Sequence, residues 1–503
     1  MRARRSTRLR TKGPVAHRGI EVREAPFPQR PSPGRDNARA GRATLLRVSI
    51  LGLGLASAGG LSACGGGSSG AAKAPSASSV APVEAARTVC GTYSGTGCAP
   101  TAARVDIAAP TFTDPTSITN PLFPISRLDS AVLLGQVDGK PFRSETTLLP
   151  NKGSVTWRGQ KVPVLLSQYA AFVDGRLEEV ALDRYAQADD GSVWYLGEDV
   201  FDYRNGGVAI TEGTWLAGRD GPAAMIMPAA PKVGDAFRPE DVTGVVFEEL
   251  SVKSAGQTVE GPRGPVAGAI VGDELHLDGH LSPKTFAPGY GEFRTVDGRD
   301  VEALALAVPI DAIPGPPPLA VSTLTTSAFA VLENARLGDW DAAQPTLRRM
   351  TGAWQSLLVD KPPPLIADRM KVSLRALTRA VGARHAGRTE QAALDVARSA
   401  LDLELRHRPA VQVDIARFHL WAQQLRVDAA AKDLAGVTGD VAVLQWMRDR
   451  ITASLDPAGL QELDSGLRGL RAAADARNLS AAADHAARLA ARLRNLTASP
   501  PTG

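Results

Sequence analysis

Apolar and polar residues alternate along the chain between about residues 107 and 312. An alternation with a period of two is typical of β-strands that bury one face. The segments that show it are residues 130–137, 146–149, 162–173, 178–185, 192–195, 242–252 and 274–281. Pairs typical of hairpin turns separate several of them, namely Asp138-Gly139, Asp174-Gly175, Asp190-Gly191 and Asn205-Gly206. This region therefore predicts sequential antiparallel strands that form a curved sheet or a partly open barrel.

The pattern becomes helical after residue 319, where Ala, Leu and Arg dominate. A short motif recurs with its alanines 48, 48 and 45 residues apart, at Ala335, Ala383, Ala431 and Ala476. Prolines recur in step with it, at residues 362–364, 409 and 457. Helical pairs at a fixed period predict about four helical hairpins in a bundle or repeat array. The alternative is a period produced by alanine-rich composition alone, which still predicts an all-α region.

Together the two patterns predict an α+β fold with two domains. An antiparallel β-sheet or half-barrel comes first, and an all-α domain of about four helical hairpins follows it. A proline-rich run between them, residues 313–319, predicts a stiff hinge. The predicted segments are an N-terminal extension with a signal peptide (1–63), a flexible tether (64–83), the β domain (84–312), the hinge (313–319), the helical domain (320–496) and a disordered tail (497–503).

The N-terminal region has the order of features found in bacterial export signals. Arginines precede an apolar core at residues 48–58, which is too short and too rich in glycine to span about 30 Å of hydrocarbon. The core leads to Leu61-Ser62-Ala63-Cys64, which resembles the bacterial lipobox, whose cysteine carries the lipid. We therefore expect an exported lipoprotein that is anchored to the cell membrane through Cys64 and faces outside the cytoplasm. An uncleaved anchor or a chance match to the motif is the alternative.

Removing the predicted signal reverses the net charge of the chain. The whole chain carries +4, but residues 1–63 hold 13 Lys and Arg against 3 Asp and Glu, which leaves 44 basic and 50 acidic residues and a net charge of −6. No basic stripe remains to neutralise phosphates, so a nucleic acid is not an expected partner. The expected partners are the membrane, through the lipid anchor, and a lipid or an envelope protein.

Two cysteines remain once Cys64 is assigned to the lipid. Cys90 and Cys98 bracket a loop rich in Gly, Ser and Thr. In a chain sent to an oxidising compartment, this arrangement predicts a local disulfide. A two-cysteine metal site is the alternative, although neither His nor another Cys lies nearby in the sequence.

Aromatic and acidic residues are interleaved between residues 184 and 215, and Trp194, Tyr195 and Glu198 are the candidate ligand-binding residues there. Carboxylates among aromatics occur in glycosidase sites, where a protonated acid works beside an ionised partner, so Glu198 and Asp199 are acid/base candidates. Adjacent strand residues point to opposite faces, so at most one of this pair can face a cleft. The turn signals favour the alternative, a hairpin with aromatics packed inward and acids in water.

A candidate metal site lies in residues 274–280. If this segment is extended, Glu274, His276, Asp278 and His280 share one face. Imidazole and carboxylate groups suit zinc, so His276 and His280 are candidate ligands. Residues two apart in a strand are separated by about 6.5–7 Å, so a partner from another strand is needed to hold one ion. A solvated strand face is the alternative.

One segment of the helical region, residues 410–432, carries a polar stripe beside its apolar one. The stripe consists of Asp414, Arg417, Trp421, Gln424 and Asp428. Such a stripe either lines a ligand groove, with Trp421 as the candidate contact, or packs and hydrogen-bonds between helices. The second reading is favoured.

Three motifs in the β region resemble an uncharacterised group of bacterial secreted proteins. They are residues 118–124, 190–199 and 287–291. This resemblance implies no particular activity. A lipid-anchored antiparallel β domain is also similar to envelope lipoproteins whose half-barrels carry acyl chains, a likeness of fold alone.

Motifs of catalysis are scarce in the sequence. It contains no phosphate loop, dinucleotide fingerprint or H-E-x-x-H pair, and its G-x-S-x-G lies in the tether, so no cofactor is expected. The sequence therefore favours a non-catalytic envelope lipoprotein whose β domain binds a ligand or partner, in one form an acyl lipid, and whose helices are a scaffold. The alternatives are a cell-envelope glycan hydrolase and a metal-binding envelope protein.

Overall fold

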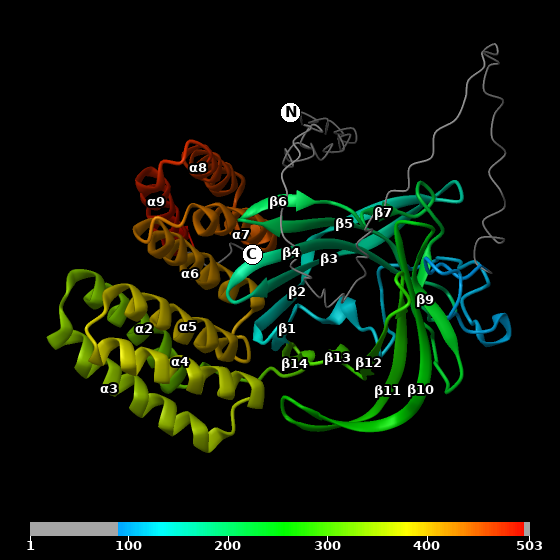
Figure 1. Cartoon of the computed structure of the whole chain (residues 1–503), viewed down its shortest axis with the longest axis horizontal. Helices are drawn as coiled ribbons and strands as arrows, with labels where there is room; N and C mark the ends of the chain where they lie inside the picture. The colour runs from blue at the N-terminus through cyan, green and yellow to red at the C-terminus, as the bar shows by residue number, and fades with distance from the viewer. Residues whose placement is uncertain (1–88, 497–503) are drawn as a thin grey trace, which may run out of the picture. The chain divides into compact units, whose positions relative to one another are not determined.

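The computed structural model describes residues 89–496, and the predicted signal peptide, Cys64, the tether and the C-terminal tail lie outside these residues. The described chain folds into an antiparallel sheet of 14 strands followed by eight helices (Figure 1). The predicted α+β class and the order of its two parts are therefore confirmed. The sheet and the helices belong to one compact unit.

The sheet follows the chain through sequential hairpins. Its strands are β1 (Ser130–Val137), β2 (Lys140–Trp157), β3 (Gln160–Val173), β4 (Arg176–Gln187), β5 (Val193–Arg204), β6 (Gly207–Ile210), β7 (Trp215–Leu216), β8 (Ala224–Met227), β9 (Ala236–Val242), β10 (Val246–Gly261), β11 (Gly264–His276), β12 (Leu281–Ala287), β13 (Gly291–Asp297) and β14 (Asp300–Val308). The strand order is β6-β5-β4-β3-β2-β1-β14-β13-β12-β11-β10-β9, and β7 and β8 both pair with β5. The first and last strands are thus neighbours in the middle of the sheet, where β1 pairs with β14.

The helices follow in pairs joined by short turns. They are α2 (Leu319–Leu337), α3 (Trp340–Leu357), α4 (Pro364–Gly382), α5 (Ala386–Glu404), α6 (Ala410–Ala430), α7 (Leu434–Ile451), α8 (Pro457–Asp475) and α9 (Leu479–Leu496). Within residues 89–496, no helix is both long enough and apolar enough to cross a membrane.

The four recurring Ala motifs lie at the turns within these pairs, and the turns share one local design. Each has a residue with positive φ after the first helix, namely Gly338, Arg384, Lys432 and Arg477. The next residue donates its N–H to the carbonyl five positions back, which is the closing bond of a Schellman motif. The side chain of that same residue then accepts the N–H three positions on and begins the second helix; these residues are Asp339, His385, Asp433 and Asn478. The recurring motif in the sequence therefore corresponds to a repeated turn, in which the C-terminal cap of one helix is followed at once by the N-cap residue of the next helix.

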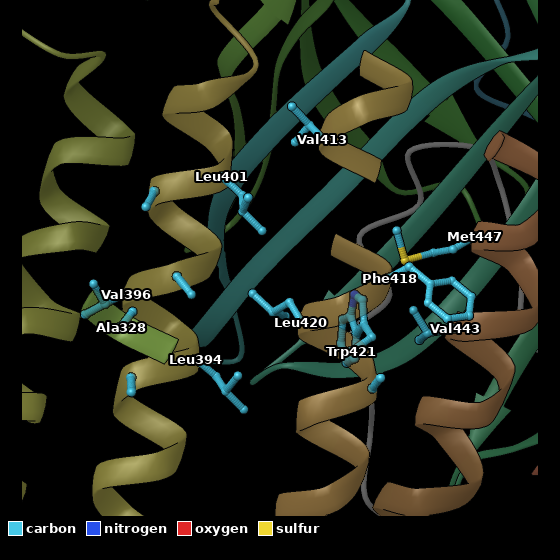
Figure 2. Close-up of a cluster of buried hydrophobic side chains, with 14 of the residues drawn as sticks. Ala328, Leu394, Val396, Leu401, Val413, Phe418, Leu420, Trp421, Val443 and Met447 are labelled. Carbon is cyan, nitrogen blue, oxygen red and sulfur yellow. The ribbon is translucent and has the colours of Figure 1, made fainter. Parts of the chain in front are cut away.

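Alternation along the strands separates two faces of the sheet. On β3, Ala170 and Phe172 belong to a large apolar core shared with the helices, whereas Tyr169 and Ala171 pack on the opposite side. We call the side away from the helices the inner face. Figure 2 shows part of the shared core, where side chains of α5, α6 and α7 such as Leu394, Phe418 and Met447 meet.

A buried network of charges joins the helix-facing side of the sheet to the helices. Arg143 of β2 donates two hydrogen bonds, each 2.7 Å, to the carboxylate of Asp402 in α5, which also accepts from Arg417 of α6 at 2.8 Å. Glu145 of β2 accepts from Arg143 at 2.9 Å and from Arg450 of α7 at 2.6 Å. Burial alone would raise the pKa of Glu145, but Arg417, Arg143 and Arg450 outweigh it and hold the pKa well below its ordinary value.

Other contacts extend this interface toward the end of the sheet at β4 to β6. Trp421 of α6 stacks on Phe172 with ring centroids 5.3 Å apart, and Trp446 of α7 donates to the Tyr203 hydroxyl at 2.7 Å. The turn at Gly206 approaches α7 so closely that a Cβ there would lie 2.1 Å from the Ala435 carbonyl oxygen. Only glycine fits at that position.

The N-terminal part of the described chain is pinned to the sheet. Cys90 and Cys98 form the predicted disulfide. Arg104 pairs with Asp106 at 2.6 Å, and the Val105 N–H donates to the Ala236 carbonyl in β9 at 2.9 Å. This segment therefore covers the edge of the sheet at β9.

Two of the predicted strands are interrupted by a turn, so residues 242–252 are extended except at 243–245, whereas the prediction of one strand over 274–281 is wrong. Residues 242–252 cross the β9–β10 hairpin, where Gly244 has φ +73°. Residues 274–281 cross the β11–β12 hairpin, where Gly279 has φ +89°. Thr243-Gly244 forms the first of these turns and Asp278-Gly279 the second, and the second has the same Asp-Gly pair as three of the predicted turns.

The buried network predicts a large cost for losing a single carboxylate. Asp402→Ala leaves Arg143 and Arg417 buried without their shared anion, so we expect a loss of about 3–5 kcal/mol in the free energy of unfolding. Asp368→Ala is the matched control because that side chain is 71% exposed and pairs with Lys371 on the surface; we expect it to cost less than about 0.5 kcal/mol. Chemical denaturation measures both, and a cost below about 1 kcal/mol for Asp402→Ala would contradict the prediction.

Candidate functional site

The inner face of the sheet carries an unusual belt of acidic side chains. Six of its carboxylates are buried, namely Asp183, Glu198, Glu240, Glu248, Glu274 and Glu302, and Glu292 is partly buried beside them. They come from β4, β5, β9, β10, β11, β14 and β13. Strand pairing aligns them: Asp183 lies opposite Glu198, and Glu240 lies opposite Glu248. The belt is therefore a product of register across the sheet and not of any one segment.

A cavity of about 80 Å³ lies against this belt. Its acidic lining residues are Asp183, Glu248, Glu274, Glu292 and Glu302, and its aromatic lining residues are Phe123, Tyr169, Tyr185, Phe286 and Tyr290. Among the described residues that line it, Lys284 is the only base. The cavity thus combines an excess of negative charge with an aromatic and aliphatic wall.

Three groups of the belt have the arrangement of metal ligands. One ligand atom each from Glu248, Glu274 and His276 lies within 4.8 Å of the other two. His276 stands directly opposite Glu248 in the β10–β11 ladder, and its Nδ1 is 3.5 Å from Glu248 Oε1, longer than an ordinary hydrogen bond of about 2.7–3.2 Å. Its Nε2 is 3.9 Å from Glu274 Oε2 and 3.1 Å from the Ser282 hydroxyl. A tetrahedral zinc ion with bonds of about 2.0–2.1 Å requires ligand atoms about 3.3 Å apart, so the three groups would have to move closer together to hold one ion through a single ring nitrogen.

Lys284 is the internal counter-ion of the belt. Its ammonium lies 3.1 and 3.0 Å from the two oxygens of Glu274 and 3.7 Å from Glu292. Burial would lower the pKa of Lys284, but Glu274 and Glu292 outweigh it and raise the pKa above its ordinary value. Burial and then Glu248 raise the pKa of Glu274 to about 8, even though Lys284 acts in the opposite direction.

Glu198 of β5 and Glu240 of β9 form a carboxyl pair. Trp215 of β7 donates its Nε1–H to Glu240 Oε1 at 3.2 Å. Burial, followed by the neighbouring carboxyl, raises the pKa of Glu198 well above its ordinary value. Burial and the Glu248 charge raise the pKa of Glu240 in the same way. Each carboxyl group therefore favours the neutral form, because burial and a neighbouring negative charge both disfavour ionisation.

No protein-family model matches this chain, and no curated protein matches it either.

The structure places the other predicted site residues as follows. Trp194 is buried and donates to the Ser192 hydroxyl at 2.8 Å, and Tyr195 is buried and donates to Asp183 at 2.8 Å. Asp199 points away from Glu198 and pairs with Arg184. Trp421 is buried in the interface between the helices and the sheet, far along the chain from the belt.

The two histidines that were grouped as metal candidates are separated by the β11–β12 turn. His276 ends β11 and joins Glu248 and Glu274. His280 lies in the turn with its side chain 48% exposed, and its Nε2 is 2.7 Å from Asp297. Because Asp278-Gly279 forms a turn, the prediction that residues 274–280 extend along one face is wrong.

Glu248, Lys284, Glu240 and Glu302 are the site residues that sequence reasoning missed. Each is a charged residue in a β-rich strand, such as Glu248, which precedes Glu249 in the run Val246-Phe247-Glu248-Glu249-Leu250. The sequence did contain one signal for these residues, namely a charged residue at a strand position where the alternation predicts an inward-facing side chain. Which of them meet depends on strand order, which no local pattern contains.

The belt predicts that stability falls as the pH rises. Burial raises the pKa of Asp183 to about 7, and burial raises the pKa of Glu302 well above its ordinary value. Because these folded-state pKa values exceed the unfolded values of about 4, the folded protein binds more protons than the unfolded chain above about pH 4. We therefore expect the melting temperature to fall between pH 5 and pH 8 in protein freed of metal by dialysis against EDTA.

Asp183→Asn isolates one of these groups while keeping an acceptor for Tyr195. Since one pKa unit corresponds to about 1.4 kcal/mol, we expect the stability of the variant relative to the wild type to increase by about 2–3 kcal/mol between pH 5 and pH 8. Asp199→Asn, which removes a partner of Arg184 on the other side of the strand, is the control. An Asp183→Asn effect of the same size at both pH values would show that ionisation of Asp183 is not its cause.

Proposed function

We propose that this protein is a metal-binding envelope lipoprotein, in which the sheet holds a divalent cation and the helices support the sheet. The observation that carries the metal site is the convergence of Glu248, Glu274 and His276 from two neighbouring strands. Of the groups weighed from the sequence, His276 is retained as a ligand, and Glu248 supplies the cross-strand partner that a strand site needs.

The ligand chemistry favours a zinc-like ion. Imidazole nitrogen and carboxylate oxygen together suit Zn²⁺, and two carboxylates would offset its charge in a buried place. In this arrangement His276 Nδ1 would bind the ion while Nε2–H donates to Ser282, which matches the way metal-bound histidines are usually oriented by a second partner. When bound, such an ion would supply positive charge and Lewis acidity.

The alternatives from the sequence are less well supported by the same geometry. An acyl-lipid carrier needs an apolar cavity, and the largely aromatic and aliphatic wall of this one is interrupted by five carboxylates and a lysine. For a glycan hydrolase, Glu198 lies against Glu240 and does not line the cavity, and Asp199 is paired with Arg184. A catalytic role is therefore not part of the proposal.

The export and anchoring of the protein also belong to the proposal. Their support is the lipobox-like Leu61-Ser62-Ala63-Cys64 after a short apolar core, together with the Cys90–Cys98 disulfide, which suits an oxidising compartment. Two finer architectural readings go with it: the sheet as a half-barrel whose inner face encloses the cavity, and the helices as four hairpins that repeat one turn.

Zinc titration of the full chain, purified in detergent and freed of metal with EDTA, tests the site. We expect one equivalent of Zn²⁺ to bind, and His276→Ala to weaken binding at least tenfold because it removes the only nitrogen ligand. His280→Ala is the matched control, since its exposed ring contacts Asp297 outside the set. Equal affinities for wild-type and His276→Ala protein, or no binding of Zn²⁺ or Mn²⁺, would refute the metal site.

Fractionation of cells tests the anchor. We expect the wild-type protein in the membrane fraction with fatty-acid label attached, and Cys64→Ser without label and released from that fraction, because the thiol is the attachment point. Ser69→Ala in the spacer is the control and should remain attached. Retention of the label in Cys64→Ser would place the lipid elsewhere or remove it from the proposal.

A further inference from the structure

The charges around the cavity are not balanced by the residues that line it. Lys284 contributes one positive charge between Glu274 and Glu292, and a divalent ion at Glu248 and Glu274 would contribute two more. Of the five acidic residues of the lining, this leaves the equivalent of two, of which Asp183 and Glu302 are the ones outside those pairs. Buried carboxylates without counter-charge are costly, so this end of the cavity favours a cationic ligand.

Glu302 supplies the more specific observation. Its side chain is fully buried and lines the cavity. Its Oε1 accepts a hydrogen bond from the Ser144 hydroxyl, whereas its Oε2 has no hydrogen-bond partner among the described residues. Burial raises the pKa of Glu302 and favours its neutral carboxyl, whereas a ligand that brings a charged N–H to this oxygen would stabilise the carboxylate.

The rest of the wall indicates what else the ligand carries. Leu128, Leu133 and Phe286 line the cavity and present only hydrocarbon to it. A volume of about 80 Å³ holds roughly five or six water-sized groups, since one water needs about 10–15 Å³ measured in this way. Glu292, whose side chain is 20% exposed, marks a place where the lining reaches solvent.

We propose that this cavity binds a short primary alkylammonium ion, with its ammonium group on Glu302 and its alkyl chain against the hydrocarbon wall. A quaternary ammonium has no N–H for Glu302 Oε2, and an inorganic cation gains nothing from Leu128, Leu133 and Phe286. This ligand goes beyond the proposed metal site, because it uses a different strand and different carboxylates. Lys284, an ammonium already held by Glu274 in the same cavity, illustrates the chemistry.

Isothermal titration of the EDTA-treated full chain with n-butylammonium chloride tests the proposal. We expect one equivalent to bind. Two probes of similar size serve as controls: n-butanol, which lacks the charge, and tetramethylammonium, which lacks the N–H. Both should bind at least tenfold more weakly, and equal binding of butanol and butylammonium would overturn the proposal because the site would then be merely apolar.

Variants locate the ammonium and separate this site from the metal site. We expect Glu302→Gln to weaken butylammonium binding at least tenfold, and Asp183→Asn to weaken it several-fold through loss of nearby negative charge. His276→Ala should bind butylammonium as the wild type does, and Asp199→Asn, outside the cavity, likewise. If Glu302→Gln fails to fold, Asp183→Asn decides the matter. If Glu302→Gln and Asp183→Asn, or whichever of the two folds, bind butylammonium as tightly as the wild type does, the proposal is overturned.

The same proteins distinguish the two proposals. Loss of zinc binding in His276→Ala with intact butylammonium binding supports both sites. Zinc binding without butylammonium binding in the wild type contradicts only the ammonium site, and the reverse result contradicts only the metal site.

Discussion

The charge network between β2 and the helices is the constraint on which the rest of the structure depends. Arg143 and Glu145 face the helices and are tied to Asp402, Arg417 and Arg450 by buried hydrogen bonds. The residue between them, Ser144, points to the other face and donates to Glu302. The interface with the helices therefore also sets the position of β2 over the cavity, so that helices far from the site support its geometry. Separating the two parts would break the Arg143–Asp402 and Arg450–Glu145 bonds and leave the remaining buried charges incompletely matched on each side.

The inner face shows the opposite electrostatic design. At the helix interface arginines and carboxylates match, whereas on the inner face carboxylates outnumber the two basic groups, Lys284 and His276. Hydrogen bonds from Tyr195 and Trp215, and protonation favoured by burial, reduce the cost of this excess. A protein keeps such an arrangement at a cost in stability, and strongly perturbed carboxyl groups beside a cavity are typical of functional sites. Both proposed ligands are cations for this reason.

The helical part combines local regularity with an irregular partner surface. In each of its four turns, a residue with positive φ is followed by a residue whose side chain caps the next helix. These local interactions make each turn nearly independent of its surroundings. The stripe on α6 is not regular in this sense: Asp414 and Arg417 join the buried network, Trp421 stacks on Phe172, and Asp428 pairs with Arg176 of β4. A polar stripe that looked suited to a ligand groove is here the surface on which the sheet is docked.

Local patterns in the sequence determined the α+β class, the order of the two parts, the hairpin turns at Asp138, Asp174, Asp190 and Asn205, the Cys90–Cys98 disulfide and the period of the helical turns. Each of these depends on residues within a few positions of one another, where backbone preferences act directly. The tertiary structure alone decided that Glu248 faces His276, that Glu248 and Glu302 line one cavity, and that His280 lies in the turn with its ring stacked 6.3 Å from that of His276. Those relations depend on which strands pair and in which register, and alternation along a strand states only which face a residue takes, not which partner it meets there.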